Sequence, residues 1–284
     1  MSNVFTRSWE ITKLTFTVMK KDKKLFVFPL LGGLFSVLFL IAIFWPVLFL
    51  GSTLESVNGI GFYGILFILY LGLAFISLFF NTCTVYVVRQ RFDGKTTTFG
   101  QAIKFAFSKI HYIFVWAIVS AIVGLILRLL EEAAEQIGGL GEIVAKILIG
   151  MLGAAWAIMT MFVIPGMVYE NIGPFKALKK SVKTVNATWG ESLTKYYGLG
   201  IMQFIFLLLG VVITIVFAII TSGIPVLMWI IIGLGILYLI AIVMFFAVAN
   251  AVFNTAIYYY AEKGKIPVGY KEEVMANAFA KKPK

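Results

Sequence analysis

The positive charges of this 284-residue chain gather in four short segments, and long apolar stretches separate them. Of the 24 Lys and Arg residues, 22 lie in these segments. A helix needs roughly 20 residues to cross the ~30 Å hydrocarbon core of a bilayer. Six apolar stretches approach or exceed that length, at about 25–50, 60–88, 112–130, 143–168, 196–221 and 224–260. The pattern predicts an all-α polytopic membrane protein with six transmembrane helices.

The composition agrees with a membrane protein, because 61% of the residues are hydrophobic and only 13% are charged. Soluble domains have about 25% charged residues. Six spans leave little chain for a soluble domain, so we expect residues 1–284 to form a single membrane domain. The apolar run that follows residues 1–24 is too long for a cleaved signal peptide, and we interpret it as a retained first span.

The charge distribution also predicts the orientation. The N-terminus, the second-to-third and fourth-to-fifth connections and the tail carry a net charge of +14, whereas the other three connections carry −3. Lys and Arg are enriched in cytoplasmic loops. We therefore expect a multi-pass protein of the cell membrane with both termini in the cytoplasm.

Three basic segments have the periodicity of amphipathic helices: residues 1–24, about 98–110 and about 174–187. In the last of these, Phe175, Leu178 and Val182 recur at helical spacing and lysines lie opposite. Such helices lie in the membrane interface. Each one precedes a pair of spans, which predicts three parallel repeats of an interfacial helix plus a transmembrane hairpin. Residues 261–284 form a basic cytoplasmic tail, in which Tyr270–Phe279 is a weaker fourth amphipathic segment.

Two spans end alike, with Phe-Asn-Thr at residues 80–82 and again at 253–255. This shared tripeptide supports the repeat, although any basic loop between spans can look amphipathic by chance. The candidate polar vestibule is formed by uncharged residues of the inner leaflet: Asn81, Thr82, Asn250, Asn254 and Thr255. These residues either line a polar pathway or make hydrogen bonds between helices that fix packing. Pro165 is expected to kink the fourth span near its inner end.

The basic segments predict contacts with anionic lipid headgroups. The candidate lysines are those of the two internal interfacial helices, namely Lys104, Lys109, Lys176, Lys179, Lys180 and Lys183. Nucleic acid is not an expected partner, because the cations flank membrane spans. On the opposite side, Glu131, Glu132 and Glu135 form either a cation-attracting outer rim or a solvated helix end.

Catalysis is not expected. No Asp, Glu, Lys or Arg lies in the middle of a span, where such groups mark coupled transport. The single Cys83 and the single His111 give neither a metal site nor a redox pair. The chain contains none of the common catalytic motifs, so we expect no enzyme activity and no cofactor.

Two sets of short motifs resemble known membrane proteins. Arg7-Ser8-Trp9-Glu10, Lys21-Asp22-Lys23 and Phe28-Pro29-Leu30-Leu31-Gly32 resemble the start and first-span entry of an uncharacterised family of six-span bacterial and archaeal membrane proteins. The segment Gly173–Ser181 is similar to a P-x-x-A-L-x-x-S interfacial segment of related domains, among them the membrane region of some glycerophosphodiester phosphodiesterases. The resemblance implies six spans and supplies no catalytic residues.

Two hypotheses for function follow. The first is a passive pore or permeation role for a homo-oligomer, motivated by the asparagines, the kinked fourth span and the lack of coupling residues. The second is a lipid-organising or partner-anchoring scaffold that acts through the basic interfacial helices.

Overall fold

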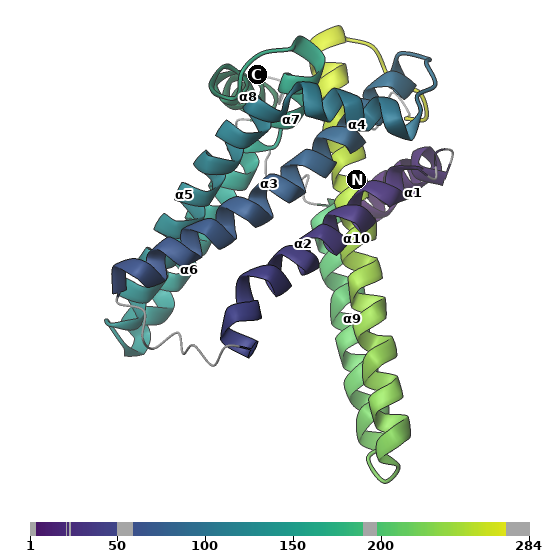
Figure 1. Ribbon diagram of the computed structural model, residues 1–284. Helices are drawn as coiled ribbons and strands as arrows, with labels where there is room; N and C mark the ends of the chain where they lie inside the picture. The colour runs from purple at the N-terminus through teal and green to yellow at the C-terminus, as the bar shows by residue number, and fades with distance from the viewer. Residues whose placement is uncertain (1–3, 21, 23, 50–58, 190–197, 271–284) are drawn as a thin grey trace. The chain divides into compact units, whose positions relative to one another are not determined.

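The computed structural model describes residues 4–20, 22, 24–49, 59–189 and 198–270, and every regular element in these ranges is a helix (Figure 1). The helices are α1 (Val4–Lys20), α2 (Lys24–Phe49), α3 (Gly59–Phe92), α4 (Phe99–Ser108), α5 (Ile110–Glu135), α6 (Gly139–Thr160), α7 (Val163–Glu170), α8 (Pro174–Trp189), α9 (Gly198–Ile220) and α10 (Pro225–Lys263). Within the described ranges, six helical segments are long and apolar enough to cross a membrane. The predicted fold class, an all-α membrane protein with six spans, is confirmed.

The observed spans differ from the predicted ones mainly at their ends. Helix α3 continues four residues past Val88, and α5 extends from Ile110 to Glu135. Hydropathy marks only the apolar part of a helix, whereas backbone hydrogen bonding continues into the polar interface. The predicted fourth span is divided into α6 and α7. The predicted fourth amphipathic segment, Tyr270–Phe279, lies outside the described residues except for Tyr270.

The chain divides into two compact units, one of Met1–Val27 with Ala187–Lys284 and the other of Phe28–Asn186. A single membrane domain therefore stays a prediction. The first predicted interfacial helix, α1, belongs to the same unit as the last hairpin.

In the unit Phe28–Asn186, α3 packs against α4, α5 and α7, and α5 packs against α6. Buried side chains of α3 gather in its last turns, from Phe79 to Phe92. The other end of this unit exposes large apolar side chains, such as Leu140 and Ile147. An apolar surface of this kind suits contact with lipid, because lipid tails are as apolar as leucine.

In the other unit, α9 and α10 form a long hairpin, and α1 packs against both helices (Figure 1). Buried residues of α10 lie between Phe246 and Tyr259. The segment after α10 returns to α1, where the hydroxyls of Thr15 and Tyr270 are 3.0 Å apart in a buried hydrogen bond. Gly269 has a φ of +99°, and a Cβ there would lie 2.7 Å from Val18. Helix α1 and the segment after α10 therefore meet within this unit.

Glycines permit a close approach of α9 and α10. The ring of Tyr238 on α10 packs against Gly210 on α9, and Thr214 on α9 packs against Gly235 on α10. A Cβ at either glycine would overlap the opposing side chain. Small residues at such positions let helix backbones approach closely inside a membrane.

The C-terminal ends of α3 and α10 share local structure as well as sequence. Thr82 donates to the carbonyl of Leu78 at 2.8 Å, and Thr255 donates to that of Ala251 at 2.6 Å. A glycine with positive φ follows each helix, Gly94 at +73° and Gly264 at +63°. Asn171, with a φ of +58°, has the same place after α7. These similarities support the predicted triplication, which itself stays a prediction.

Candidate functional site

Helix α4 begins with a capping box. The N–H of Gln101 donates to the Thr98 hydroxyl at 3.2 Å, and the N–H of Thr98 donates to Gln101 Oε1 at 2.8 Å. This exchange satisfies two backbone donors at the helix start, and the T-x-x-Q spacing is its sequence signature. The buried side of the helix contains Ala102 and Ala106, which are fully buried.

Aromatic rings hold α4 against the ends of two spans. Phe99 stacks on Phe28 of α2, with ring centroids 5.3 Å apart. Phe105 stacks on Tyr86 of α3 at 4.3 Å. Aromatic pairs of this kind each add about 0.5–1.5 kcal/mol beyond the burial of their area. The predicted interfacial helix is therefore fixed in place and is not a loose loop.

Helix α8 is attached through Ser181, which is fully buried. Its hydroxyl donates to the carbonyl of Met159 at 2.6 Å and accepts from the N–H of Phe162 at 3.2 Å. Met159 lies in the last turn of α6, and Phe162 lies in the interruption between the end of α6 at Thr160 and the start of α7 at Val163. Backbone groups freed inside a membrane must be satisfied by protein. Ser181 satisfies two of them.

Pro165, the predicted kink residue, is the third residue of α7. A proline in the first turn of a helix is tolerated, because the N–H that it lacks has no partner within the helix there. The interruption itself falls at Met161 and Phe162, just before the helix that contains the proline. Phe162 to Val168 are all buried, so the interrupted segment is enclosed by protein.

The six candidate lysines fall into two groups. Four of them, Lys104, Lys176, Lys179 and Lys183, are exposed and make no hydrogen bond or ion pair within the described residues. Lys109 donates to the side-chain oxygen of Asn171, and Lys180 pairs with Glu170. Only the first group is open to an external anion.

Lys109 and Lys180 contact residues at the C-terminal end of α7, and a third cation, Arg89, lies at the same end. Arg89 of α3 donates to the carbonyl of Val168 at 2.5 Å, and its guanidinium lies 5.2 Å from the centre of the Tyr169 ring. Cations at a helix C-terminus are favoured by the helix dipole and by carbonyls that lack partners within the helix. Sequence reasoning assigned Arg89 only to a basic loop. Its role depends on the fold of α7, which no local pattern reveals.

The candidate vestibule residues are divided between the units. Asn81 and Thr82 lie in one unit, and Asn250, Asn254 and Thr255 lie in the other. Both threonines are buried and donate to carbonyls of their own helices. The three asparagines are half-buried, and their side chains make no hydrogen bond within the described part of the chain.

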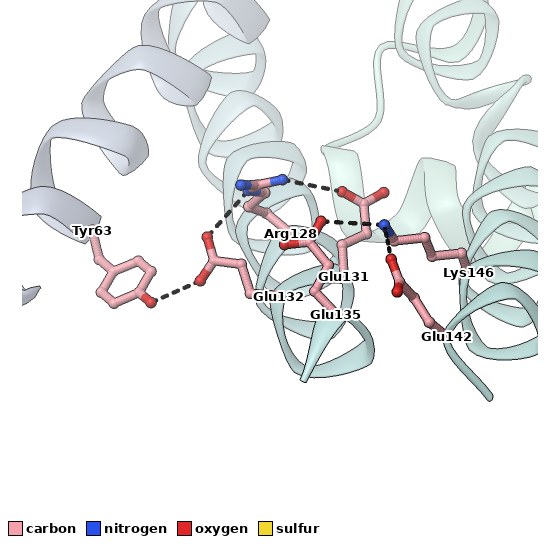
Figure 2. Close-up of polar contacts among 7 residues, drawn as sticks. All are labelled: Tyr63, Arg128, Glu131, Glu132, Glu135, Glu142 and Lys146. Atoms are coloured by element: carbon pink, nitrogen blue, oxygen red, sulfur yellow. Dashed lines mark hydrogen bonds and ion pairs between the residues drawn. The ribbon is translucent and has the colours of Figure 1, made fainter. Parts of the chain in front are cut away.

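At the other end of the unit Phe28–Asn186, two polar clusters connect α3 with α5 and α5 with α6 (Figure 2). Tyr63 donates to Glu132 at 2.8 Å, and Arg128 pairs with Glu132 at 3.1 Å and with Glu131 at 3.7 Å. Lys146 pairs with Glu135 at 3.3 Å and with Glu142 at 2.7 Å. The predicted acidic rim thus has its carboxylates paired. No group of three or more potential metal ligands lies close together among the described residues.

Comparison with known proteins gives a family. DUF6159, a family of unknown function, matches residues 60–268, well over half of the chain. The chain belongs to this family. Its uncharacterised status agrees with the resemblance drawn from the sequence motifs. No curated protein and no solved structure matches the chain, so the likeness to the membrane region of glycerophosphodiester phosphodiesterases has no support.

Proposed function

We propose that the protein is a non-enzymatic membrane scaffold that binds anionic lipid through the lysines of α4 and α8. The observation that carries this proposal is the exposure of Lys104, Lys176, Lys179 and Lys183 on helices whose opposite sides are buried in the protein. Lysines left exposed on a fixed helix present positive charge to a membrane surface, where each cation contributes about 1 kcal/mol of attraction to anionic lipid.

The faces of α8 suit a position in the membrane interface. Its protein-contact face contains the buried Ala177, Ser181 and Val185. The lysine face, defined as Lys176, Lys179 and Lys183, lies on the opposite side of the helix. An apolar flank lies between these two faces and consists of Phe175, Leu178 and Val182. Leu178 and Val182 are half-buried, and Phe175 is 63% exposed. An interfacial helix requires this combination of an apolar flank for acyl chains and cations for headgroups.

The test measures lipid preference. The full chain is reconstituted with equal amounts of phosphatidylglycerol and phosphatidylcholine, and the lipids retained after detergent extraction are quantified by native mass spectrometry. Wild-type protein is expected to retain several-fold more phosphatidylglycerol. Substitution of Lys104, Lys176, Lys179 and Lys183 by Gln is expected to abolish that preference, whereas substitution of the same four by Arg preserves it.

A charge-matched control separates the helix surface from net charge. The tail variant with Lys271, Lys281, Lys282 and Lys284 changed to Gln loses the same four charges. It is expected to keep most of the preference. Equal loss in both variants would show that only total charge matters and would refute the scaffold proposal.

A passive pore is a second candidate, favoured by the half-buried asparagines that lack hydrogen bonds within the described residues. An amide in hydrocarbon without a partner costs several kcal/mol, so water or a second chain would have to supply one. The variants Asn81→Leu and Asn254→Leu are expected to change solute flux through liposomes if the amides line a pathway. Flux equal to that of protein-free liposomes in the wild type would exclude this role.

A further inference from the structure

The two internal interfacial helices repeat one five-residue pattern. Residues 102–106 of α4 read Ala-Ile-Lys-Phe-Ala, and residues 177–181 of α8 read Ala-Leu-Lys-Lys-Ser. Each begins and ends with a small residue, has a branched aliphatic residue second and has a lysine third. The two segments lie about 75 residues apart in the sequence. Their similarity in residue type, position by position, is closer than a shared amphipathic pattern alone would require.

The pattern places equivalent residues in equivalent environments. Both small pairs, Ala102 with Ala106 and Ala177 with Ser181, are 0% exposed. Ile103 and Leu178 are both half-buried, and Lys104 and Lys179 are both exposed. Residues four apart lie on one side of a helix, so each small pair forms a flat strip. That strip lets the helix lie close to the spans and turns the third residue, the lysine, outward.

Each lysine also has an exposed aromatic neighbour about one turn away. Phe107 on α4 is 57% exposed, and Phe175 on α8 is 63% exposed. Helical geometry places each phenylalanine within about 60° of its lysine around the helix axis. A cation beside an exposed apolar ring matches a lipid molecule, whose phosphate and acyl chain are adjacent. A free phosphate ion would use only the cation.

We infer that the chain contains two similar phospholipid sites, each of which binds one anionic lipid: one at Lys104 with Phe107, which follows the lysine by one turn, and one at Lys179 with Phe175, which precedes it by one turn. This inference rests on the proposed function and adds the number of bound lipids and the positions of their sites. The other lysines of α8 have no counterpart on α4, because Lys176 corresponds to Gln101 and Lys183 to Ser108. Lys176 and Lys183 add electrostatic attraction for anionic lipid in general but do not form a repeated site.

The test counts lipids on single variants of the full chain. Native mass spectrometry with dioleoylphosphatidylglycerol is expected to show two tightly bound lipids on the wild type. Lys104→Gln and Lys179→Gln are each expected to retain one, and the double variant none. Lys183→Gln, on the same helix as Lys179, is the matched control and is expected to retain two. Circular dichroism melting of each variant checks that the fold is intact.

The outcomes separate this inference from the proposed function. Loss of a lipid in Lys183→Gln equal to that in Lys179→Gln, or two lipids retained by Lys104→Gln, would overturn the paired sites while leaving lipid preference standing. Equal retention of phosphatidylcholine and phosphatidylglycerol by the wild type would overturn both. Displacement of the bound lipids by millimolar glycerol phosphate would show that headgroup chemistry alone is recognised and would refute the role of the phenylalanines.

Discussion

Ser181 is the residue on which the attachment of α8 most depends. Its hydroxyl is the described partner of the Met159 carbonyl and of the Phe162 N–H at the interruption of the fourth span. The structure thus explains the small residue at the end of the Gly173–Ser181 segment. A larger side chain would crowd this fully buried position, and an apolar one would remove both hydrogen bonds.

Ser181→Ala is therefore expected to lower the free energy of unfolding by about 2–3 kcal/mol, because an unsatisfied buried group costs about 1–3 kcal/mol. Thermal unfolding in detergent, followed by circular dichroism, measures the change. Ser108→Ala is the control, since the exposed Ser108 hydroxyl donates only to the carbonyl of Phe105 within its own helix. Equal melting temperatures for the two variants would contradict the role given to Ser181.

Tyr270 provides a second prediction for a single residue. Burial raises the pKa of its hydroxyl, so the side chain is neutral when it bonds Thr15. Tyr270→Phe keeps the ring and removes the bond, and it is expected to destabilise the contact between α1 and the segment after α10 by about 1 kcal/mol. Faster hydrogen exchange in residues 12–20 would reveal the loss. Unchanged exchange would mean that packing alone holds α1.

The sequence predicted which residues are exposed better than it predicted which residues contact one another. Exposure of Lys176 and Lys179 follows from helical periodicity, which is local information. The engagement of Lys109 and Lys180 at the end of α7 could not be predicted, because it requires Asn171 and Glu170 to approach from another element. The same limit applies to Arg89, whose partner is 79 residues away in the chain.

Among the elements, the pair α9 and α10 shows how tight packing depends on single glycines. Gly235→Ala would place a methyl group against Thr214 and is expected to destabilise the hairpin by about 1–3 kcal/mol through overpacking. Gly233→Ala, two residues away in the same helix, meets nothing within 4 Å and is the matched control. It is expected to be neutral or stabilising by up to about 1 kcal/mol, since alanine favours helix. Thermal unfolding in detergent measures the stability of the Gly235→Ala and Gly233→Ala variants. Equal losses of stability in both would contradict the packing argument.

The two polar clusters that connect α3 with α5 and α5 with α6 are expected to contribute only modestly to the free energy of unfolding. Their charged groups are partly exposed, and ion pairs of that kind contribute about 0–1 kcal/mol. Lys146→Gln is expected to lower the stability only slightly and to leave lipid preference unchanged. Thermal unfolding at low and high salt distinguishes an electrostatic contribution, which salt screens, from a loss of packing, which it does not.

Helix boundaries illustrate what local sequence contains. The six spans follow from apolar length, and the start of α4 carries a capping box that can be read from Thr98 and Gln101. The division of the fourth span between Thr160 and Val163 was less predictable, because Pro165 marks a disturbance without fixing its position. Ser181, whose hydroxyl bonds the backbone beside the interruption, comes from a later helix, so no local pattern reveals this contact.

For the whole molecule, the contact between Thr15 and Tyr270 bears on the predicted orientation. Because the two residues are hydrogen-bonded, α1 and the segment after α10 lie at the same end of their unit. This supports the expectation that both termini lie on one side of the membrane. The repeat, the single domain and the cytoplasmic assignment depend on the placement of the units or of the membrane and stay predictions.

Cysteine labelling tests this orientation. In a Cys83→Ala background, Gly223→Cys lies in the exposed turn between α9 and α10 and is expected to react with an impermeant maleimide on intact cells. Lys284→Cys, in the tail, is expected to react only after permeabilisation. Labelling of the tail in intact cells would reverse the predicted orientation.

The contact between α1 and the segment after α10 also constrains biosynthesis. Thr15 leaves the ribosome some 255 residues before its partner Tyr270. Helix α1 therefore reaches its final packing only after the hairpin of α9 and α10 has been made. A nascent chain that stops before α9 would leave α1 without the helices against which it packs, and so accessible to proteolysis or chaperones.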